Sequence, residues 1–195
     1  SYSLMCQSFG LNASNARLFG NVSLLESITR EPHAEKDGPI VFFEQAIIPR
    51  YYEERKYLVD QLCILAQRYP EKQILVKARA SGKKATLHRT WHSIEELFNQ
   101  KQKKEGALPP NIAQTGETAA SLLSKSSHCL TISSTVAVEA IYANVPTTII
   151  SDFGAHDDYG LQYFYGSGLL RNFAQIDLLK PPVCEEKWLK NNTFL

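Results

Sequence analysis

The chain has 195 residues, of which 44% are hydrophobic and 21% charged, so it can bury the core of one large domain or two small ones. A formal net charge of +1 at pH 7 gives no bulk attraction to nucleic acid or to an anionic membrane. No segment approaches the roughly 20 consecutive apolar residues of a transmembrane helix. The four cysteines form no Cys-x-x-Cys pair, which disfavours a zinc ribbon or a thioredoxin motif and fits a reducing compartment.

Residues 1–38 contain short apolar pieces between turn signals, and they end at the turn Asp37-Gly38-Pro39. We interpret residues 1–38 as a linker or the remnant of a preceding amino-terminal domain. Residues 39–195 are then one domain. The first residue is not methionine, so we expect the chain to be a fragment or a processed form.

Short apolar segments alternate with helix signals along the rest of the chain. Regularly spaced leucines predict a helix over Tyr51–Tyr69, and a capping box at Ser93–Glu96 predicts a second helix that begins near Ile94. A third helix is predicted over Glu117–Lys125, and a fourth follows Thr135. The predicted buried strands are Ile40–Phe43, Ile74–Val76, Ile112–Gln114, Cys129–Ile132 and Thr147–Ile150.

This alternation predicts an α/β fold, a Rossmann-like doubly wound parallel sheet with right-handed crossovers. Beyond the fifth strand, the aromatic segment Asp157–Tyr165 and the segment Phe173–Leu179 are predicted to be helical. A last amphipathic turn is expected around Trp188. Ligands of such sheets bind outside the carboxyl ends of the strands, so the loops there are the candidate site.

Three consecutive hydroxyl residues, Ser133, Ser134 and Thr135, connect the fourth strand to its helix. A helix N-terminus presents unpaired N–H donors and a partial positive charge, and hydroxyls add donors without bulk. The stretch therefore indicates a phosphate-binding turn. The alternative is that these residues only cap a helix, because serine and threonine are common N-caps.

A basic loop follows the second strand and contains Lys77, Arg79, Lys83 and Lys84. Lys77 and Arg79 lie on the same side of an extended segment, and such cations suit a diphosphate or a sugar carboxylate. The alternative is an ordinary solvated loop. His88, near the end of this loop, is a candidate donor to phosphate.

Other polar residues stand at or near the predicted strand ends. Glu44 directly follows the first strand and could accept a proton or hold a ribose hydroxyl. Glu139, in the helix after the serines, could bond ribose hydroxyls or simply point to solvent. Thr115 and Gly116 form the loop after the third strand. Asp152 follows the fifth strand and could contact substrate or cap the next helix.

Metal binding and several common cofactor motifs are not expected. His88 and His92 have the spacing of a helical metal pair, but the capping box places both before the helix and no third ligand is evident, so we predict no metal. No Gly-x-Gly-x-x-Gly, Walker A or Gly-x-Ser-x-Gly motif is present. A dinucleotide oxidoreductase, a P-loop NTPase and an α/β-hydrolase are accordingly disfavoured.

Taken in order, the motifs resemble a family of proteins assigned as bacterial glycosyltransferases. The resemblance covers roughly residues 40–170. Its motifs are Val76-Lys77-Ala78-Arg79, Thr86-Leu87-His88, Thr115-Gly116, Thr131 to Ala140, Ile150-Ser151-Asp152-Phe153-Gly154 and Gly166-Ser167-Gly168-Leu169. The serine motif is also similar to the one with which bacterial sialyltransferases and Kdo transferases hold the phosphate of a CMP-sugar. Those enzymes pair it with a His-Pro motif, which this chain lacks, and His88 is a loose substitute.

The resemblance implies the carboxyl-terminal, donor-binding half of a GT-B glycosyltransferase that needs no metal or cofactor. The donor would be a nucleotide sugar, with CMP-activated donors favoured over UDP-activated ones, and the acceptor a surface glycan or a related molecule. The nucleotide would contact residues of the basic loop, the Thr115 loop, the serine motif and the segment after it. By resemblance these are Lys77, Arg79, His88, Thr115, Gly116, Ser133, Ser134, Thr135, Glu139 and Asp152. The catalytic base would come from a missing amino-terminal half, although Glu44 and His88 are candidates in this chain.

A bacterial cytoplasmic protein of capsule or lipopolysaccharide biosynthesis is expected from this resemblance, with the periphery of the inner membrane as an alternative location. Two other functions stay open. A nucleotide-sugar epimerase can share the two-lobed architecture and needs no acceptor. A non-catalytic nucleotide-sugar-binding module would bind the nucleotide and turn over nothing.

Overall fold

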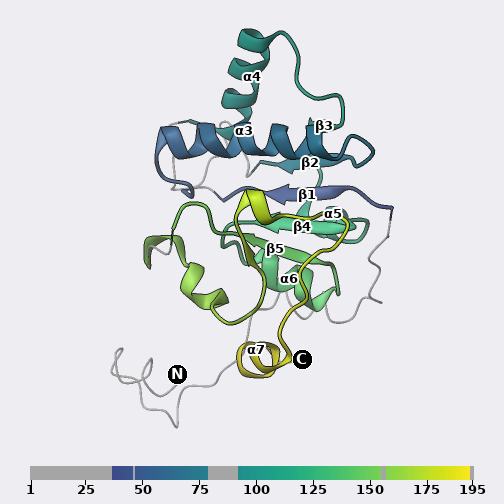
Figure 1. Ribbon diagram of the computed structural model, residues 1–195, viewed down its shortest axis with the longest axis vertical. Coiled ribbons are helices and arrows are strands. Elements are labelled where there is room, and N and C mark those ends of the chain that lie inside the picture. Colours follow the sequence, from purple (N-terminus) through teal and green to yellow (C-terminus); the bar gives the residue numbers. More distant parts are fainter. Residues whose placement is uncertain (1–36, 46, 79–91, 155–156, 194–195) are drawn as a thin grey trace.

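The structure is a computed structural model, and it describes residues 37–45, 47–78, 92–154 and 157–193. The described residues form one sheet of six parallel strands in the order β3-β2-β1-β4-β5-β6. Figure 1 shows this order from β3 at the top to β5 below. The strands are β1 (Ile40–Phe43), β2 (Ile74–Lys77), β3 (Ile112–Gln114), β4 (His128–Thr131), β5 (Thr147–Ile150) and β6 (Leu170–Arg171). The predicted Rossmann-like parallel sheet is confirmed.

Helices cover both faces of the sheet. Helix α3 (Tyr52–Arg68) and helix α4 (Ile94–Glu105) pack on one face, where their leucines join side chains of β1, β2 and β4. Helix α5 (Ala119–Leu123) and helix α6 (Val136–Tyr142) contribute to a smaller cluster on the other face. Strands β1, β4 and β5 are buried along their whole length, as expected for strands covered on both faces, whereas β3 is largely exposed.

The segment after β5 differs from the prediction. Two short 3₁₀ helices, η1 (Asp157–Tyr159) and η2 (Leu161–Phe164), replace the single predicted helix, because Gly160 adopts a left-handed φ of 69° between them. The predicted helix Phe173–Leu179 is wrong beyond a single turn, η3 (Phe173–Gln175). The strand β6 was not predicted. The chain ends on helix α7 (Glu186–Asn192), which contains Trp188.

None of the described helices is long and apolar enough to cross a membrane. The predicted division between residues 38 and 39 stays a prediction, because residues 1–36 lie outside the described part. Cys63 and Cys129 are buried core residues, as the sequence indicates, and burial raises the pKa of both thiols.

His128, the first residue of β4, is a buried titratable group. Its Nε2 lies 2.8 Å from Thr148 Oγ1, and within the described residues its Nδ1 has no hydrogen-bond partner. Burial lowers the pKa of His128 from 6.5 to about 4. The unfolded chain therefore takes up a proton between pH 6.5 and 4 that the folded chain does not bind.

We expect the free energy of unfolding to fall by up to roughly 3 kcal/mol as the pH is lowered through this range. Urea unfolding between pH 7 and 4.5 measures it. In His128→Asn, which cannot titrate, the slope over the same range should flatten. An equal slope in both proteins would contradict a neutral buried imidazole.

Candidate functional site

The candidate site lies where the strand order reverses, between β1 and β4. From this point β2 and β3 continue on one side of the sheet, and β5 and β6 continue on the other. Open α/β sheets bind ligands in the crevice outside the carboxyl ends of the strands at such a point. We call the carboxyl ends of β1 and β4, with residues 44–45 and 132–135, the switch point. The segments that meet there are far apart in the sequence.

The residues Ser133, Ser134 and Thr135, the serine turn, connect β4 to α6. The Oγ of Ser134 accepts a hydrogen bond from the N–H of Val136 at 3.3 Å, whereas Thr135, the N-cap residue, makes no side-chain capping bond. Among the described residues, no acceptor forms a hydrogen bond with the backbone N–H of Ser134 or Thr135. Since α6 has only seven residues, these amides rather than a long helix dipole are what the turn offers an anion.

The amides of α6 itself are already used. The N–H groups of Ala137 and Val138 donate to the carbonyl oxygens of Ser134 and Thr135, both at 3.0 Å. The sequence predicts that the N-terminus of this helix supplies the donors to an anion. In the structure the available donors belong instead to the turn that precedes the helix.

A cavity of about 310 Å³ opens on the serine turn. Its other walls come from α6 and η2. It is lined by Ser133, Ser134, Thr135, Val138, Gly160, Tyr163 and Phe164. Gly160 stands against the turn, where an added Cβ would lie 3.5 Å from Ser133 Oγ. One wall is therefore polar and the opposite wall aromatic, which suits a ligand with a polar group and an apolar ring face.

Helix α7 packs against the aromatic wall of the cavity, which Tyr163 and Phe164 form. The indole of Trp188 stacks on Phe164 at 5.8 Å between centroids and meets Tyr163 edge-on at 5.4 Å. Its Nε1 donates to the carbonyl oxygen of Tyr163 at 3.1 Å. The hydroxyl of Tyr163 donates to the carbonyl oxygen of Asn192 at 2.9 Å.

Lys77 lies on the same edge of the sheet as the serine turn. It ends β2 in register with Phe43 of β1, and Thr131 of β4 is in register with the same Phe43. The backbones of Lys77 and Thr131 are therefore two strand spacings apart, about 10 Å. The start of the basic segment and the serine turn consequently share one edge, on either side of β1.

Glu44, the predicted candidate base, is buried in an ion pair. Its Oε1 lies 2.9 Å from Arg55 Nη1, and the two side chains are 5% and 4% exposed. Arg55 also donates to the carbonyl oxygen of His92 at 3.3 Å. In this geometry the carboxylate fastens the end of β1 to α3, and it is not presented to a ligand.

Asp152 also forms hydrogen bonds with other residues of the domain. It accepts hydrogen bonds from Tyr57 Oη at 2.8 Å and from the N–H of Phe173 at 2.9 Å. Burial, and then the hydrogen bond to Asp152, raise the pKa of Tyr57 to about 12. Asp152 thus joins the end of β5 to α3 and η3.

Of the remaining predicted site residues, the structure describes Thr115, Gly116 and Glu139. Thr115 and Gly116 follow β3, three strands from β4, so the sheet does not bring them next to the serine turn. Glu139 is half-buried on α6, and its charge, after burial, raises the pKa of Cys129. The predicted residues Arg79, Lys83, Lys84 and His88 lie outside the described residues.

Sequence reasoning missed Gln45. Its Oε1 accepts from the backbone N–H of Ser133 at 3.0 Å and from Ser133 Oγ at 3.2 Å. The signal was present, because Gln45 is the second polar residue after a buried strand that ends at the predicted ligand edge. What could not be read was its partner, 88 residues away.

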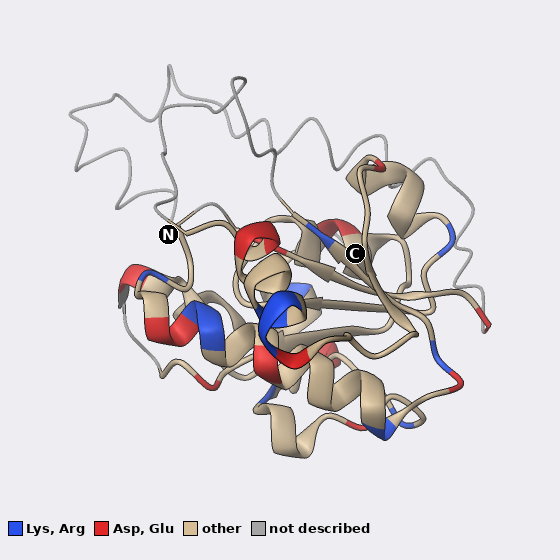
Figure 2. Cartoon of the chain, turned by 90° about the horizontal axis from the view of Figure 1, so that it is seen from above, with Lys and Arg blue, Asp and Glu red and all other residues tan. Residues whose placement is uncertain are grey.

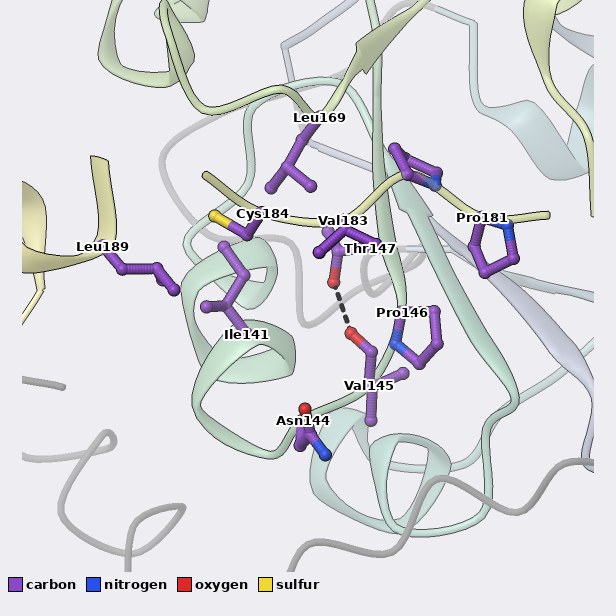
Figure 3. A pocket seen from close by; sticks show the side chains of 11 residues that line it. Ile141, Asn144, Val145, Pro146, Thr147, Leu169, Pro181, Val183, Cys184 and Leu189 are labelled. Atoms are coloured by element: carbon purple, nitrogen blue, oxygen red, sulfur yellow. Dashed lines mark hydrogen bonds between the residues drawn. The ribbon is translucent and has the colours of Figure 1, made fainter. Parts of the chain in front are cut away.

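A second cavity, of about 320 Å³, lies at the opposite edge of the sheet, beside the start of β5 (Figure 3). Its lining is mostly apolar, with Ile141, Leu169 and Leu189 among the side chains that converge on it. The polar contact drawn there is internal, from Thr147 Oγ1 to the carbonyl oxygen of Val145 at 2.8 Å. It offers no obvious phosphate donors.

Acidic and basic residues both occur along the described helices (Figure 2). Within the described residues no group of three or more His, Cys, Asp or Glu side chains is placed to hold a metal ion.

Comparison with known proteins identifies a family. A family model described as "Putative glycosyltransferase (DUF6716)" matches residues 2–195. No curated protein sequence matches the chain.

Several solved structures are similar to this chain at low sequence identity. UDP-GlcNAc 2-epimerase from Neisseria meningitidis, bound to UDP-GlcNAc, is 13% identical with a TM-score of 0.51, over 85% of this chain and 45% of that one. The glycotransferase of kitacinnamycin is 11% identical with a TM-score of 0.42, over 86% and 35%. The pneumococcal O-GlcNAc transferase GtfA, in complex with UDP and GlcNAc, is 16% identical with a TM-score of 0.44, over 74% and 26%. This chain therefore spans less than half the length of each.

Proposed function

We propose, because the chain belongs to the family described as "Putative glycosyltransferase (DUF6716)", that it is the donor-binding half of a glycosyltransferase acting on a nucleotide sugar. The observation that carries the proposal is the serine turn at the switch point. Its backbone amides at Ser134 and Thr135 have no acceptor among the described residues, and they border a cavity of about 310 Å³.

The reaction would be a displacement at the anomeric carbon of the donor sugar. The bond from that carbon to the nucleotide phosphate oxygen breaks, a bond to an acceptor hydroxyl oxygen forms, and the hydroxyl proton passes to a base. The amides of the serine turn, with Lys77 nearby, would stabilise the negative charge that develops on the departing phosphate. Donors that supply this stabilisation can replace a metal ion, so we propose metal-independent transfer.

The other parts of the reaction belong to groups beyond the described residues. We propose that a second, amino-terminal half supplies the acceptor site and the base, since Glu44 is held by Arg55. By the similarity of its serine motif, CMP-activated donors are the first class to test, with UDP-activated donors second. A bacterial surface glycan as acceptor, and a cytoplasmic or membrane-peripheral location, complete the proposal.

Thr135→Asp tests the role of the serine turn without breaking the fold. Thr135 is exposed and makes no side-chain capping bond, and aspartate is a favourable N-cap, so the variant should keep its melting temperature. The added negative charge beside the two amides should raise the Kd for CMP or UDP about 30-fold or more. Titration calorimetry measures both proteins.

Asn99→Asp is the matched control, because it adds the same charge at an exposed position of α4. Its Kd should stay within twofold of the unmodified protein. If neither CMP nor UDP binds the unmodified protein, the proposed function is wrong. If Thr135→Asp binds them normally, the serine turn is not the phosphate site.

A further inference from the structure

Gln45 bridges the switch point from β1 to β4. It follows Glu44 at the end of β1, is half-buried, and reaches Ser133 with a single atom. That atom, Oε1, accepts both the N–H and the Oγ–H of Ser133, at 3.0 and 3.2 Å. Two donors of the serine turn are thus occupied by one side chain of the neighbouring strand's loop.

These two bonds fix which way the carboxamide faces. A backbone N–H can only donate, so the atom that meets Ser133 must be the amide oxygen and not the nitrogen. The NH₂ group of Gln45 then occupies the other branch of the same planar amide. No described residue accepts a hydrogen bond from this NH₂.

The backbone that carries Gln45 is itself anchored. The N–H of Glu44 donates to the carbonyl oxygen of Lys77 at 3.0 Å, and the Glu44 carboxylate is paired with Arg55. Gln45 therefore starts from a fixed point between β2 and α3. A donor held on a rigid base loses little entropy when a ligand binds.

We infer that Gln45 is a binding residue for the donor phosphate, with two functions in one side chain. Its Oε1 holds the serine turn in shape, and its NH₂ group donates to a phosphate oxygen beside the amides of Ser134 and Thr135. This inference rests on the proposed function. Gln45 is then a neutral donor that supplements the backbone amides of the serine turn.

Gln45→Glu separates the two functions. A carboxylate has nearly the same shape and still accepts from Ser133, so the serine turn keeps its support and the melting temperature should not fall. The two N–H donors are lost and a negative charge takes their place, so the Kd for CMP and UDP should rise at least 30-fold. Gln45→Ala loses both functions and should lower the melting temperature as well as the affinity.

Gln102→Glu, on the exposed side of α4, is the control for added charge and should bind nucleotide as the unmodified protein does. A Gln45→Glu variant that binds CMP and UDP within twofold of the unmodified protein would overturn the inference and leave the proposed function intact. If the unmodified protein binds neither nucleotide, both are overturned.

Discussion

Replacing Arg55 with methionine is expected to lower the free energy of unfolding by about 3–5 kcal/mol. Arg55 and Glu44 are 4% and 5% exposed and lie 2.9 Å apart, so the substitution removes the guanidinium charge from beside a buried carboxylate. The guanidinium also donates to the carbonyl oxygen of His92, and this bond would be lost too. Urea unfolding at pH 7 measures the loss.

Two further variants distinguish charge burial from simple loss of packing. The double variant Glu44→Leu, Arg55→Met removes both charges and should recover most of the lost stability, because paired apolar replacements are often neutral. Lys190→Met breaks an ion pair whose side chains are 74% and 87% exposed and should cost under about 0.5 kcal/mol. A double variant as unstable as the single one would contradict the account of Arg55.

Replacing Trp188 with alanine is expected to cost about 3–5 kcal/mol, the range for removing a buried aromatic side chain. Trp188 is 5% exposed, stacks on Phe164, and is the buried residue of the seven-residue helix α7. Because Phe164 and Tyr163 form the aromatic wall of the cavity, nucleotide affinity should fall together with stability.

Trp188→Phe and Lys187→Ala serve as controls for this prediction. Phenylalanine keeps a ring against Phe164 and loses the hydrogen bond to the Tyr163 carbonyl oxygen, so about 1 kcal/mol should be lost. Lys187 is exposed on the same helix, and its replacement should change stability by less than about 0.5 kcal/mol. If Trp188→Ala unfolds at the same urea concentration as Lys187→Ala, α7 does not support the domain.

Most of the sheet could be predicted from sequence because its central strands β1, β4 and β5 are buried on both faces. Such strands read as uninterrupted apolar runs, and the predicted bounds of Ile40–Phe43 and Thr147–Ile150 agree with the structure. The strand β6 escaped prediction because it has only two residues, and both are half-buried. The helix predicted over Asp157–Tyr165 failed because Gly160 divides it.

The candidate site was predicted in part. The serine turn and Lys77 were identified because polar residues after buried strands gather at one edge of a parallel sheet. Two carboxylates at the same edge, Glu44 and Asp152, prove to be bonded to Arg55 and to Tyr57. Those partners lie on α3, and only the packed structure reveals them. The bond from Ser133 to Gln45 spans 88 residues and leaves no local pattern to read.

The most direct test of the account is to titrate the ¹⁵N-labelled protein with CMP and with UDP and follow its amide resonances. The account predicts saturable shifts, for at least one nucleotide, at Ser133, Ser134 and Thr135 and in the side-chain NH₂ of Gln45. Shifts confined to the opposite edge of the sheet, around Val145 and Thr147, or no shift with either nucleotide, would contradict it.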